Sequence, residues 1–401
     1  MDYVPYKFNL SDEERIVLKT LDDFKRRENL AERTLEWNAQ EHYPVELYKS
    51  AAELGFFGQL FSEEYGGTPV SERLCALTNS NFCEDIPELF MSWSASVALF
   101  GLQLREAGTE DQKKKYLPPI ILGDKLGAFC LTEASGGSNS AFYGDTVLAD
   151  AGDYFLLNGQ KTFITNGTHA DYFYVFCRDA SCKKGDRAGI RSVVVEREYG
   201  VESTKLKDKM GMRCSDTATI YFEDVKVPKD CLVFGREGFS EIDAFNVTLE
   251  NLVRERAGCM YMSLGIARGV VKRIMPYLTS ERVIMRKSGP VYPISFPLVK
   301  DKVRDMLSAV RQKQRVVFSI ADDIDSGNQQ NVLDDVIREK IETVEMAIDV
   351  AKNAIQLAGG YGFMEESHLP RLHSAAMLLS IGGGTVEIQK SILDKMYGFP
   401  K

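Results

Sequence analysis

The chain of 401 residues lacks the patterns that mark most metal sites and disulfide-rich proteins. Its four histidines show no His-Glu-x-x-His or comparable ligand spacing, so no metal site is expected. Its eight cysteines are scattered and form no Cys-x-x-Cys pair, which favours reduced thiols in a cytoplasmic compartment. We therefore expect the cysteines to serve in packing and any chemistry to depend on other residues.

The chain also lacks an excess of positive charge and any long apolar run. It has 49 Lys and Arg against 58 Asp and Glu, a formal net charge of -9. Because phosphate binding needs clustered basic residues, no nucleic-acid partner is expected, and the basic run at 113–115 is interpreted as a solvated helix face. No apolar stretch approaches the ~20 residues of a membrane-spanning helix. The first residues show no signal-peptide pattern, so a cytoplasmic location is expected.

What the chain does have is enough apolar sequence for a sizeable core. Hydrophobic residues make up 44% and charged residues 27%, which suits two or three globular domains. The periodicity changes twice along the sequence. We expect an α+β fold with an N-terminal helical domain at 1–125, a middle β-barrel or β-sandwich domain at 126–235 and a C-terminal four-helix bundle at 236–401.

Helical signals dominate the first third. Ser11 and Glu14 have the spacing of a capping box, and Leu21 and Phe24 follow at helical intervals. We therefore predict an amphipathic helix that starts near residue 12. Another helix is predicted over 110–116, ended by two consecutive prolines.

The middle third favours strands. Short runs rich in β-branched and aromatic residues alternate with Gly, Asn and Asp, and the clearest strands are 172–176, 192–195 and 217–222. Residues 157–160, with the sequence Leu-Asn-Gly-Gln, are predicted to form a hairpin turn because Asn-Gly tolerates positive φ. Pro228 marks the expected exit from this domain.

The last third has the strongest helical periodicity. Apolar residues spaced by four and three predict one long helix that ends at Gly359-Gly360: Ile337, Ile341, Val344, Ile348, Ala351 and Ile355. A second apolar stripe predicts a neighbouring helix: Val303, Met306, Leu307, Val310 and Val317. Such stripes are typical of the core of a helical bundle.

Polar and aromatic residues gather at three points of the middle third. The runs are Phe129-Cys130-Leu131-Thr132-Glu133, Gly136-Gly137-Ser138-Asn139 and Phe163-Ile164-Thr165-Asn166-Gly167. Hydroxyl and backbone donors at strand ends beside an aromatic ring suit a flat, polar heteroaromatic cofactor. The same residue types favour ordinary turns, so these runs alone leave both interpretations open.

Taken with other segments, these runs resemble the acyl-CoA dehydrogenase family over the whole chain. The other segments are Glu63-Glu64-Tyr65-Gly66-Gly67, Lys209-Met210-Gly211-Met212-Arg213, Phe222-Glu223-Asp224-Val225-Lys226-Val227-Pro228 and Ile355-Gln356-Leu357-Ala358-Gly359-Gly360-Tyr361-Gly362. The resemblance implies the three domains above, with FAD in the crevice between the β domain and the bundle. It also implies a homodimer or a homotetramer.

The resemblance further implies which residues contact FAD. The flavin-facing positions are Phe129, Leu131, Thr132, Gly137, Ser138, Phe163 and Thr165. The contacts made from a neighbouring subunit to the adenosine end are Gln356, Leu357, Gly360 and Thr385. Arg286 keeps the place of a residue that pairs with the pyrophosphate, and a surface ion pair is its alternative role. Pro297 and the pair His373-Ser374 depart from the family pattern, which implies weaker intersubunit contacts or a changed dimer.

The implied reaction needs a base. It removes the α proton of an acyl thioester while the β hydride passes to flavin N5, and the N–H of Gly383 helps polarise the carbonyl. Many members carry this base as Glu in a Tyr-Glu-Gly-Thr run, whereas this chain has Gly382-Gly383-Gly384-Thr385.

Glu255 is the candidate base. A minority of the family place Glu on a bundle helix before an Arg that lies nine residues ahead of a Gly, and Glu255-Arg256 with Gly265 has this spacing. A solvated Glu in a charged cluster is the alternative role for Glu255. Glu250 is a rival base, and only one of the two can face the flavin because they lie about 140° apart around a helix.

We therefore expect FAD-dependent α,β-dehydrogenation of an acyl-CoA or of an acyl or aminoacyl group on a carrier protein, and the divergent base loop is consistent with a biosynthetic role. Electron-transfer flavoprotein or oxygen is the expected electron acceptor. Lys205, Lys207 and Lys209 suit an acidic carrier protein or, equally, a solvated strand edge. The missing loop Glu also favours a flavin oxidase or monooxygenase as the alternative function. Loss of both the base and the FAD contacts would leave a scaffold without activity.

Overall fold

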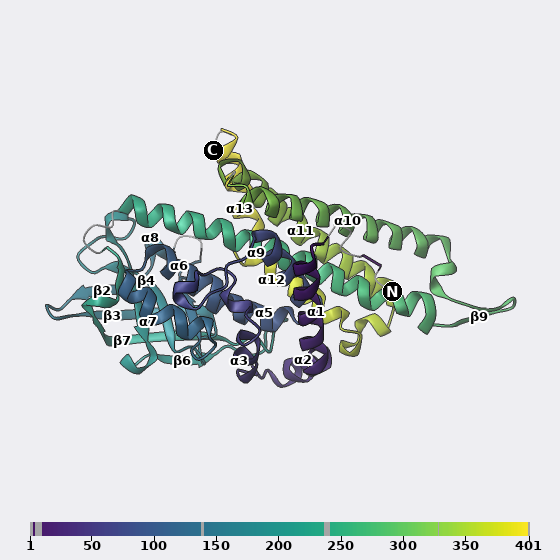
Figure 1. The fold of residues 1–401 in the computed structure, drawn as a ribbon, viewed down its shortest axis with the longest axis horizontal. Coiled ribbons are helices and arrows are strands. Elements are labelled where there is room, and N and C mark those ends of the chain that lie inside the picture. Colours follow the sequence, from purple (N-terminus) through teal and green to yellow (C-terminus); the bar gives the residue numbers. More distant parts are fainter. Residues whose placement is uncertain (1–2, 5–9, 138–139, 236–240, 328, 400–401) are drawn as a thin grey trace.

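Three groups of elements follow one another along the chain in the computed structural model (Figure 1). The structure describes residues 3–4, 10–137, 140–235, 241–327 and 329–399, and their side chains except those of 141–142, 241–252 and 329–331. The first group is helical: α1 (Asp12–Arg27), α2 (Leu30–Gln40), α3 (Glu46–Ala52), α4 (Glu72–Cys83), α5 (Pro87–Ser94), a π-helical segment (Ala95–Gly101), α6 (Leu102–Ala107) and α7 (Glu110–Ile121).

The sequence predictions for the start of α1 and the end of α7 can be compared with the structure. The capping box of α1 is confirmed, since the Ser11 side chain accepts a hydrogen bond from Glu14 N and the Glu14 side chain accepts one from Ser11 N. The expected end of α7 is wrong, because the helix continues through Pro118 and Pro119. The amide hydrogens that these prolines lack would serve the carbonyls of exposed lysines, where water can take their place.

The second group is a sheet of eight strands. They are β1 (Gly127–Cys130), β2 (Val147–Asp150), β3 (Tyr154–Thr165), β4 (Tyr172–Asp179), β5 (Ile190–Glu196), β6 (Glu202–Lys205), β7 (Thr217–Pro228) and β8 (Leu232–Phe234), with the short helix α8 (Ser140–Tyr143) between β1 and β2. The strand order is β6-β7-β3-β2-β4-β5-β8, and β1 pairs in parallel with β4. The three strands expected from the sequence are confirmed within β4, β5 and β7.

The expected hairpin turn at residues 157–160 is wrong. β3 passes straight through it and pairs with β7 on both sides, with a bulge between Leu157 and Gly159. Gly159 has φ of 146°, and a Cβ at this position would lie 2.5 Å from Thr146 Cα. The Asn-Gly pair therefore provides a close approach of two backbones inside a strand instead of a chain reversal.

The third group is the helical bundle. It contains α9 (Glu241–Pro276), a π-helical turn (Tyr277–Glu281), the hairpin β9 (Ile284–Arg286) and β10 (Gly289–Val291), α10 (Pro297–Asp325), α11 (Gln329–Ala358), α12 (Leu369–Ile381) and α13 (Val386–Met396). Both predicted long helices are confirmed as α10 and α11. α11 packs along α9, α10 and α12, and the protruding hairpin of β9 lies at the opposite end of the molecule from the sheet (Figure 1).

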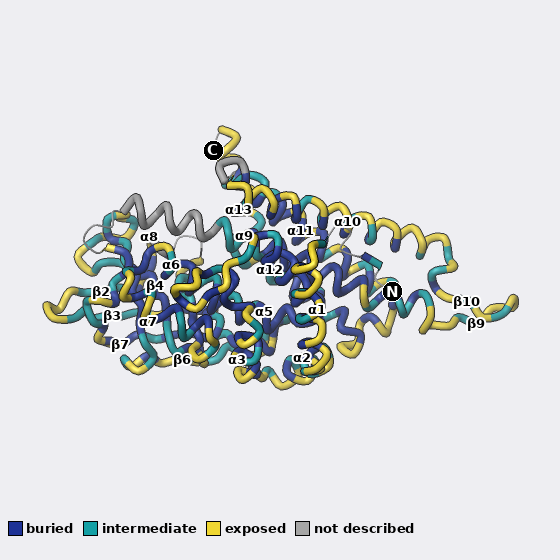
Figure 2. Tube along the Cα trace, in the orientation of Figure 1, coloured by how far each residue is buried: buried dark blue, intermediate teal, exposed yellow. Residues whose placement is uncertain are grey.

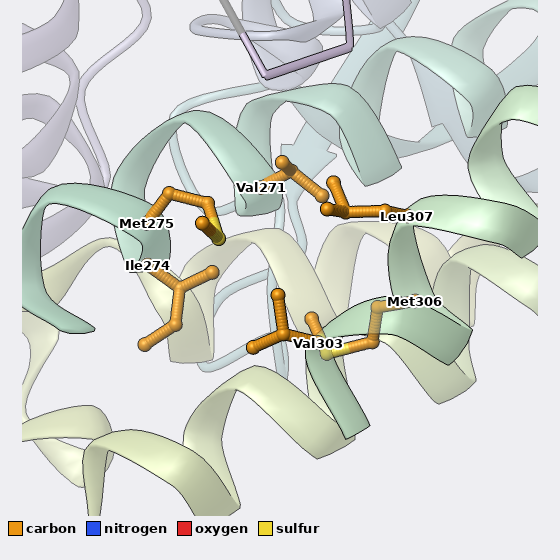
Figure 3. Close-up of a pocket in the computed structure, with 6 residues that line it drawn as sticks. All are labelled: Val271, Ile274, Met275, Val303, Met306 and Leu307. Carbon is orange, nitrogen blue, oxygen red and sulfur yellow. The ribbon is translucent and has the colours of Figure 1, made fainter. Parts of the chain in front are cut away.

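The largest hydrophobic core joins the first and third groups (Figure 2). Side chains of α9 and α10 meet in its interior and leave an apolar gap without room for a water molecule (Figure 3): Val271, Ile274, Met275, Val303, Met306 and Leu307. This gap is ordinary bundle packing. Within the described residues, no helix is both long and apolar enough to cross a bilayer.

Buried ion pairs cross the same junction. Arg371 on α12 donates two hydrogen bonds, of 2.8 and 2.7 Å, to the Glu88 carboxylate on α5, and the two side chains are 2% and 0% exposed. Arg268 on α9 pairs with Glu84 at 2.7 Å, and Arg273, also on α9, pairs with Asp85 at 3.0 Å. The N-terminal helices and the bundle are thus held in one relative arrangement, which fixes α9 and α12 beside each other.

Candidate active site

Glu255 and Gly383 face each other in the bundle. Glu255 lies in the middle of α9, and Gly383 lies in the turn between α12 and α13. A Cβ on Gly383 would lie 3.7 Å from both Cγ and Cδ of Glu255, and 3.1 Å from Cys259 Sγ. The structure therefore brings together the candidate base and the candidate carbonyl donor.

The surroundings of Glu255 adjust its acidity. Burial raises the pKa of its carboxyl group, while the positive charges of Arg256 and Lys340 partly oppose that rise, and the net shift is upward. A raised pKa is what a carboxylate needs to accept a proton near neutral pH. The rival Glu250 lies in α9, but its side chain is outside the described residues.

Gly383 belongs to a turn whose carbonyl oxygens accept hydrogen bonds from two buried side chains. Lys340 of α11 donates to the carbonyl oxygens of Gly382, at 2.9 Å, and Gly384, at 2.6 Å. Gln389 of α13 donates to the carbonyl oxygen of Gly383 at 2.7 Å. Gly383 and Gly384 have φ of 65° and 85°, a region that favours glycine. Among the described residues, none accepts a hydrogen bond from Gly383 N–H.

Lys340 was missed in the sequence, although a signal exists there. It lies three residues after Ile337 and four before Val344, on the apolar stripe of the predicted long helix. A lysine on such a stripe is seldom buried without a partner, so its position in the stripe predicts a buried acceptor opposite it. The structure supplies two backbone carbonyls.

A second set of predicted residues lies at the edge of the sheet. Thr132 follows β1, and its carbonyl oxygen accepts a hydrogen bond of 2.9 Å from Thr162 N in β3. Phe163 is next in β3, with φ of 58° and a side chain that is 68% exposed. Thr165 ends β3. Hydroxyl groups and an uncovered ring are thus held at the ends of two neighbouring segments.

A buried ion pair supports this edge. Lys161 of β3 lies 2.7 Å from the Glu133 carboxylate, and the two side chains are 0% and 4% exposed. Lys161 Nζ also donates to Leu131 O at 3.2 Å, which ties the segment after β1 to β3. Burial alone would raise the pKa of Glu133, but Lys161 and backbone donors lower it overall.

The remaining predicted flavin contacts have less support. Phe129 is half-buried in β1, with its ring stacked against Tyr174 at a centroid distance of 6.2 Å. Leu131 is half-buried and Gly137 is exposed in the following loop. Ser138 lies outside the described residues.

The predicted adenosine contacts lie elsewhere. Gln356 and Gly360 are exposed at the end of α11, and Leu357 is half-buried between them. Arg286 is exposed on β9, where its guanidinium lies 5.0 Å from the centroid of the Phe296 ring. One chain therefore does not bring Arg286 to the sheet edge (Figure 1). Thr385 instead lies beside Gly384, where its hydroxyl caps α13 by accepting from Ile388 N at 3.3 Å.

Two of the three lysines at 205–209 hydrogen-bond to oxygen atoms of the same chain. Lys209 Nζ donates to Ser215 O and, at 2.8 Å, to Thr217 Oγ1, and burial lowers the pKa of Lys209 to about 8. Lys205 Nζ donates to Glu41 O. Only Lys207 of the three is exposed.

Sequence profiles of three domains match the chain in order. They are "Acyl-CoA dehydrogenase, N-terminal domain" over residues 11–124, the middle domain over 128–225 and the C-terminal domain over 244–397. The short-chain-specific acyl-CoA dehydrogenase of Clostridium acetobutylicum is 31% identical over 390 residues, covering 96% of this chain and 98% of its own.

Two further similarities cover almost the whole chain. A subunit of the caffeyl-CoA reductase–Etf complex of Acetobacterium woodii is 28% identical, with 96% of this chain and 98% of its own covered. The solved butyryl-CoA dehydrogenase of Megasphaera elsdenii superimposes with a TM-score of 0.88 at 30% identity, covering 98% of this chain and 99% of its own. Profiles, relatives and fold agree from the first helix to the last, so the chain belongs to the acyl-CoA dehydrogenase family.

Proposed function

We propose that the protein removes hydrogen from the α and β carbons of an acyl thioester, with Glu255 as the base. The observation that carries this proposal is the position of the Glu255 carboxyl group beside Gly383. Glu255 would take the α proton, and the bond electrons would form the new double bond as the β hydride leaves. FAD is the cofactor of this oxidoreductase, and it supplies the hydride acceptor.

The residues at the sheet edge fit a flavin. An aromatic ring that is 68% exposed is unusual in a strand, and Phe163 holds it there in a backbone conformation that costs energy for a residue with a Cβ. Thr132 precedes Phe163 in the sequence and Thr165 follows it, and both threonines are only half-buried. An apolar face with flanking hydroxyl donors matches a flat ring system with polar edges. We propose that these residues hold the isoalloxazine ring.

We propose that a second copy of the chain completes the FAD site. Arg286 belongs to β9, which lies at the opposite end of the molecule from the sheet, and Gln356, Leu357 and Gly360 lie at the end of α11 (Figure 1). Their exposure suits a role toward a neighbouring subunit in a homodimer or homotetramer. Thr385 lies nearer Glu255 and would contact FAD at a different point.

The turn at residues 382–384 would polarise the thioester carbonyl. The α proton becomes acidic only if charge can move onto the carbonyl oxygen, so a donor aimed at this oxygen lowers the barrier. Gly383 N–H is such a donor, next to the carboxylate that takes the proton. Proton removal and charge stabilisation would thus occur within one small region.

A CoA thioester is the first substrate to test. The relative in Clostridium acetobutylicum is named for short-chain acyl-CoA, and the neighbour from Megasphaera elsdenii for butyryl-CoA. A carrier-bound acyl group is the second substrate class to test, although Lys205 and Lys209 are engaged within the chain. The Etf-linked relative makes an electron-transfer flavoprotein the first acceptor to test, ahead of oxygen.

The proposal is tested by anaerobic mixing of the purified, FAD-loaded protein with acyl-CoA thioesters of two to sixteen carbons and with matched acyl-carrier thioesters. We expect at least one thioester to bleach the flavin absorbance within seconds and to yield the 2-enoyl product. Reoxidation is then followed with oxygen and with electron-transfer flavoprotein. Fast reoxidation by oxygen would support the alternative function of an oxidase, and no bleaching by any thioester would overturn dehydrogenation.

A further inference from the structure

Lys340 lies directly beneath the turn that carries Gly383. Its side chain is 0% exposed, and its ammonium group donates to the carbonyl oxygens of Gly382 and Gly384 at 2.9 and 2.6 Å. These two carbonyls lie on either side of Gly383 in the sequence. A buried lysine whose ammonium group donates hydrogen bonds can serve packing alone. The position of Lys340 beside Gly383, however, has a geometric consequence for the turn.

That consequence follows from the planar peptide bond. The carbonyl of Gly382 and the N–H of Gly383 belong to one peptide group, in which the C=O and N–H bonds point in opposite directions. A donor that fixes the carbonyl therefore also fixes the direction of the N–H. Because Lys340 binds the Gly382 oxygen, Gly383 N–H points away from Lys340.

The turn needs such an external hold. Three consecutive glycines have no side chains that restrict φ and ψ, so the peptide groups of residues 382–384 can rotate more freely than any other short segment. Lys340 holds the first of these groups, and Gln389, also 0% exposed, holds the next one through Gly383 O at 2.7 Å. Lys340 thus sets the direction of Gly383 N–H, and Gln389 restricts the peptide group that follows it.

The charge of Lys340 acts on the same region. A cation that binds a peptide oxygen polarises the peptide group and makes its N–H a stronger donor. Cys259, Glu255 and Arg256 of α9 are near enough for their charges to act on the pKa of Lys340. Burial lowers the pKa of Lys340, while its positive charge acts to lower the pKa of Glu255.

We propose that Lys340 is a positioning residue for the reaction: it aims and polarises the N–H of Gly383 toward the thioester carbonyl and favours the ionised form of Glu255. This inference rests on the proposed function, because it assigns a task to Lys340 within that active site. It separates two effects of one side chain. The first depends on the geometry of the ammonium group, and the second depends only on its charge.

Two variants separate these effects. Lys340→Met removes both the hydrogen bonds and the charge, whereas Lys340→Arg keeps the charge in a group of different shape. For Lys340→Met we expect flavin reduction by the best thioester to slow by about 100-fold, the order of magnitude for losing an oxyanion donor, with substrate affinity changed much less. Its pH profile should also shift to higher pH, because Glu255 loses a stabilising cation. Lys340→Arg should be slow as well, but its pH profile should stay near that of the wild type.

An infrared measurement tests the aim of the N–H without turnover. The carbonyl stretch of a bound, carbonyl-labelled 2-enoyl-CoA falls in frequency when a donor polarises the carbonyl. We expect the wild type to lower it relative to solution and both variants to lower it less. A lysine that only fills space would leave this frequency unchanged.

The outcomes distinguish the inference from the proposed function. FAD content and the thermal unfolding midpoint of each variant are recorded first, and Lys340→Arg serves if Lys340→Met does not fold. If the wild type reduces its flavin but a folded Lys340 variant does so at the same rate, with the same pH profile and carbonyl frequency, the inference is overturned alone. If no thioester reduces the wild-type flavin, both the inference and the proposed function are overturned.

Discussion

The Glu255 carboxyl group occupies the space that a side chain at position 383 would enter, because a Cβ on Gly383 would lie 3.7 Å from its Cγ and Cδ. One carboxylate on α9 can thus take the place of one carried by the turn. Under the proposed function, this relationship would let the chain lack an acidic residue in the Gly-Gly-Gly-Thr run and still place a base beside the turn. It also makes the role of Glu255 open to direct tests.

Replacing Glu255 by Gln should abolish proton removal while keeping the shape of the side chain. General-base catalysis contributes roughly 10² to 10⁴ in rate, so flavin reduction by the best thioester should slow by at least about 100-fold. Stopped-flow absorbance under anaerobic conditions measures this directly. Glu250→Gln is the matched control on the same helix and should reduce at close to the wild-type rate. The reverse result for the two variants would make Glu250 the base.

Moving the carboxylate to the turn should restore part of the lost rate. In the double variant Glu255→Gly and Gly383→Glu, the new side chain enters the space that Glu255 leaves. Recovery should be incomplete, because φ of 65° costs a residue with a Cβ about 1 kcal/mol or more and because Cys259 Sγ lies 3.1 Å from the new Cβ. The comparison is with Glu255→Gly alone. A double variant no faster than this single variant would show that the two positions are not equivalent.

The rate of flavin reduction should depend on pH through Glu255. Burial raises the pKa of this carboxyl group, with Arg256 and Lys340 opposing the rise in part. The base works only when ionised, so the rate should fall as pH decreases through a midpoint above the ordinary glutamate value of about 4.3. A pH series of single-turnover reductions measures the midpoint. A midpoint at or below the ordinary value would contradict the raised pKa of Glu255.

Local patterns predicted most of the fold, because they depend on residues close in sequence. The capping box at Ser11 and the apolar stripes of α10 and α11 need only helical geometry. The Asn-Gly pair at 158–159 was misread, since its conformation is set by pairing with β7 and by contact with Thr146. The expected domain boundaries at 125/126 and 235/236 remain predictions.

At the site too, features set by residues close in sequence were predicted and contacts between distant segments were not. The spacing around Glu255 selected the residue that lies beside Gly383, but sequence could not show that Lys340 lies beneath the turn. That contact joins α11 to a turn more than forty residues later in the chain. The partners of Lys205 and Lys209 could not be predicted for the same reason, because the sequence does not reveal which lysines hydrogen-bond to carbonyl oxygens elsewhere in the chain.

Phe163 should matter for FAD binding and little for folding. Its side chain is 68% exposed and its φ is 58°, so Phe163→Gly removes backbone strain along with the ring. We expect an unfolding midpoint of the FAD-free protein close to that of the wild type. FAD affinity should fall by about 2- to 10-fold, as expected for the loss of a ring contact of roughly 0.5–1.5 kcal/mol. Fluorescence titration of the FAD-free protein measures the affinity.

The control for this prediction is another exposed phenylalanine. Phe399 is 60% exposed just after α13, in an element other than β3, and Phe399→Gly should leave FAD affinity unchanged. Equal losses of affinity in the two variants would indicate a general effect on the fold. An unchanged affinity in Phe163→Gly would remove Phe163 from the proposed flavin contacts.

The Glu88–Arg371 pair should be needed for stability as a pair. Both side chains are almost fully buried, so among the described residues Arg371→Met leaves the Glu88 carboxylate with the 3.2 Å hydrogen bond from Asn38 alone. Leaving a buried charge unpaired costs about 3–5 kcal/mol, and the thermal unfolding midpoint should fall clearly. The double variant Glu88→Leu and Arg371→Met removes both charges and should recover much of this loss. If Arg371→Met unfolds at the wild-type temperature, or if the double variant is less stable than the single one, the pair does not hold α5 and α12 together by its charges.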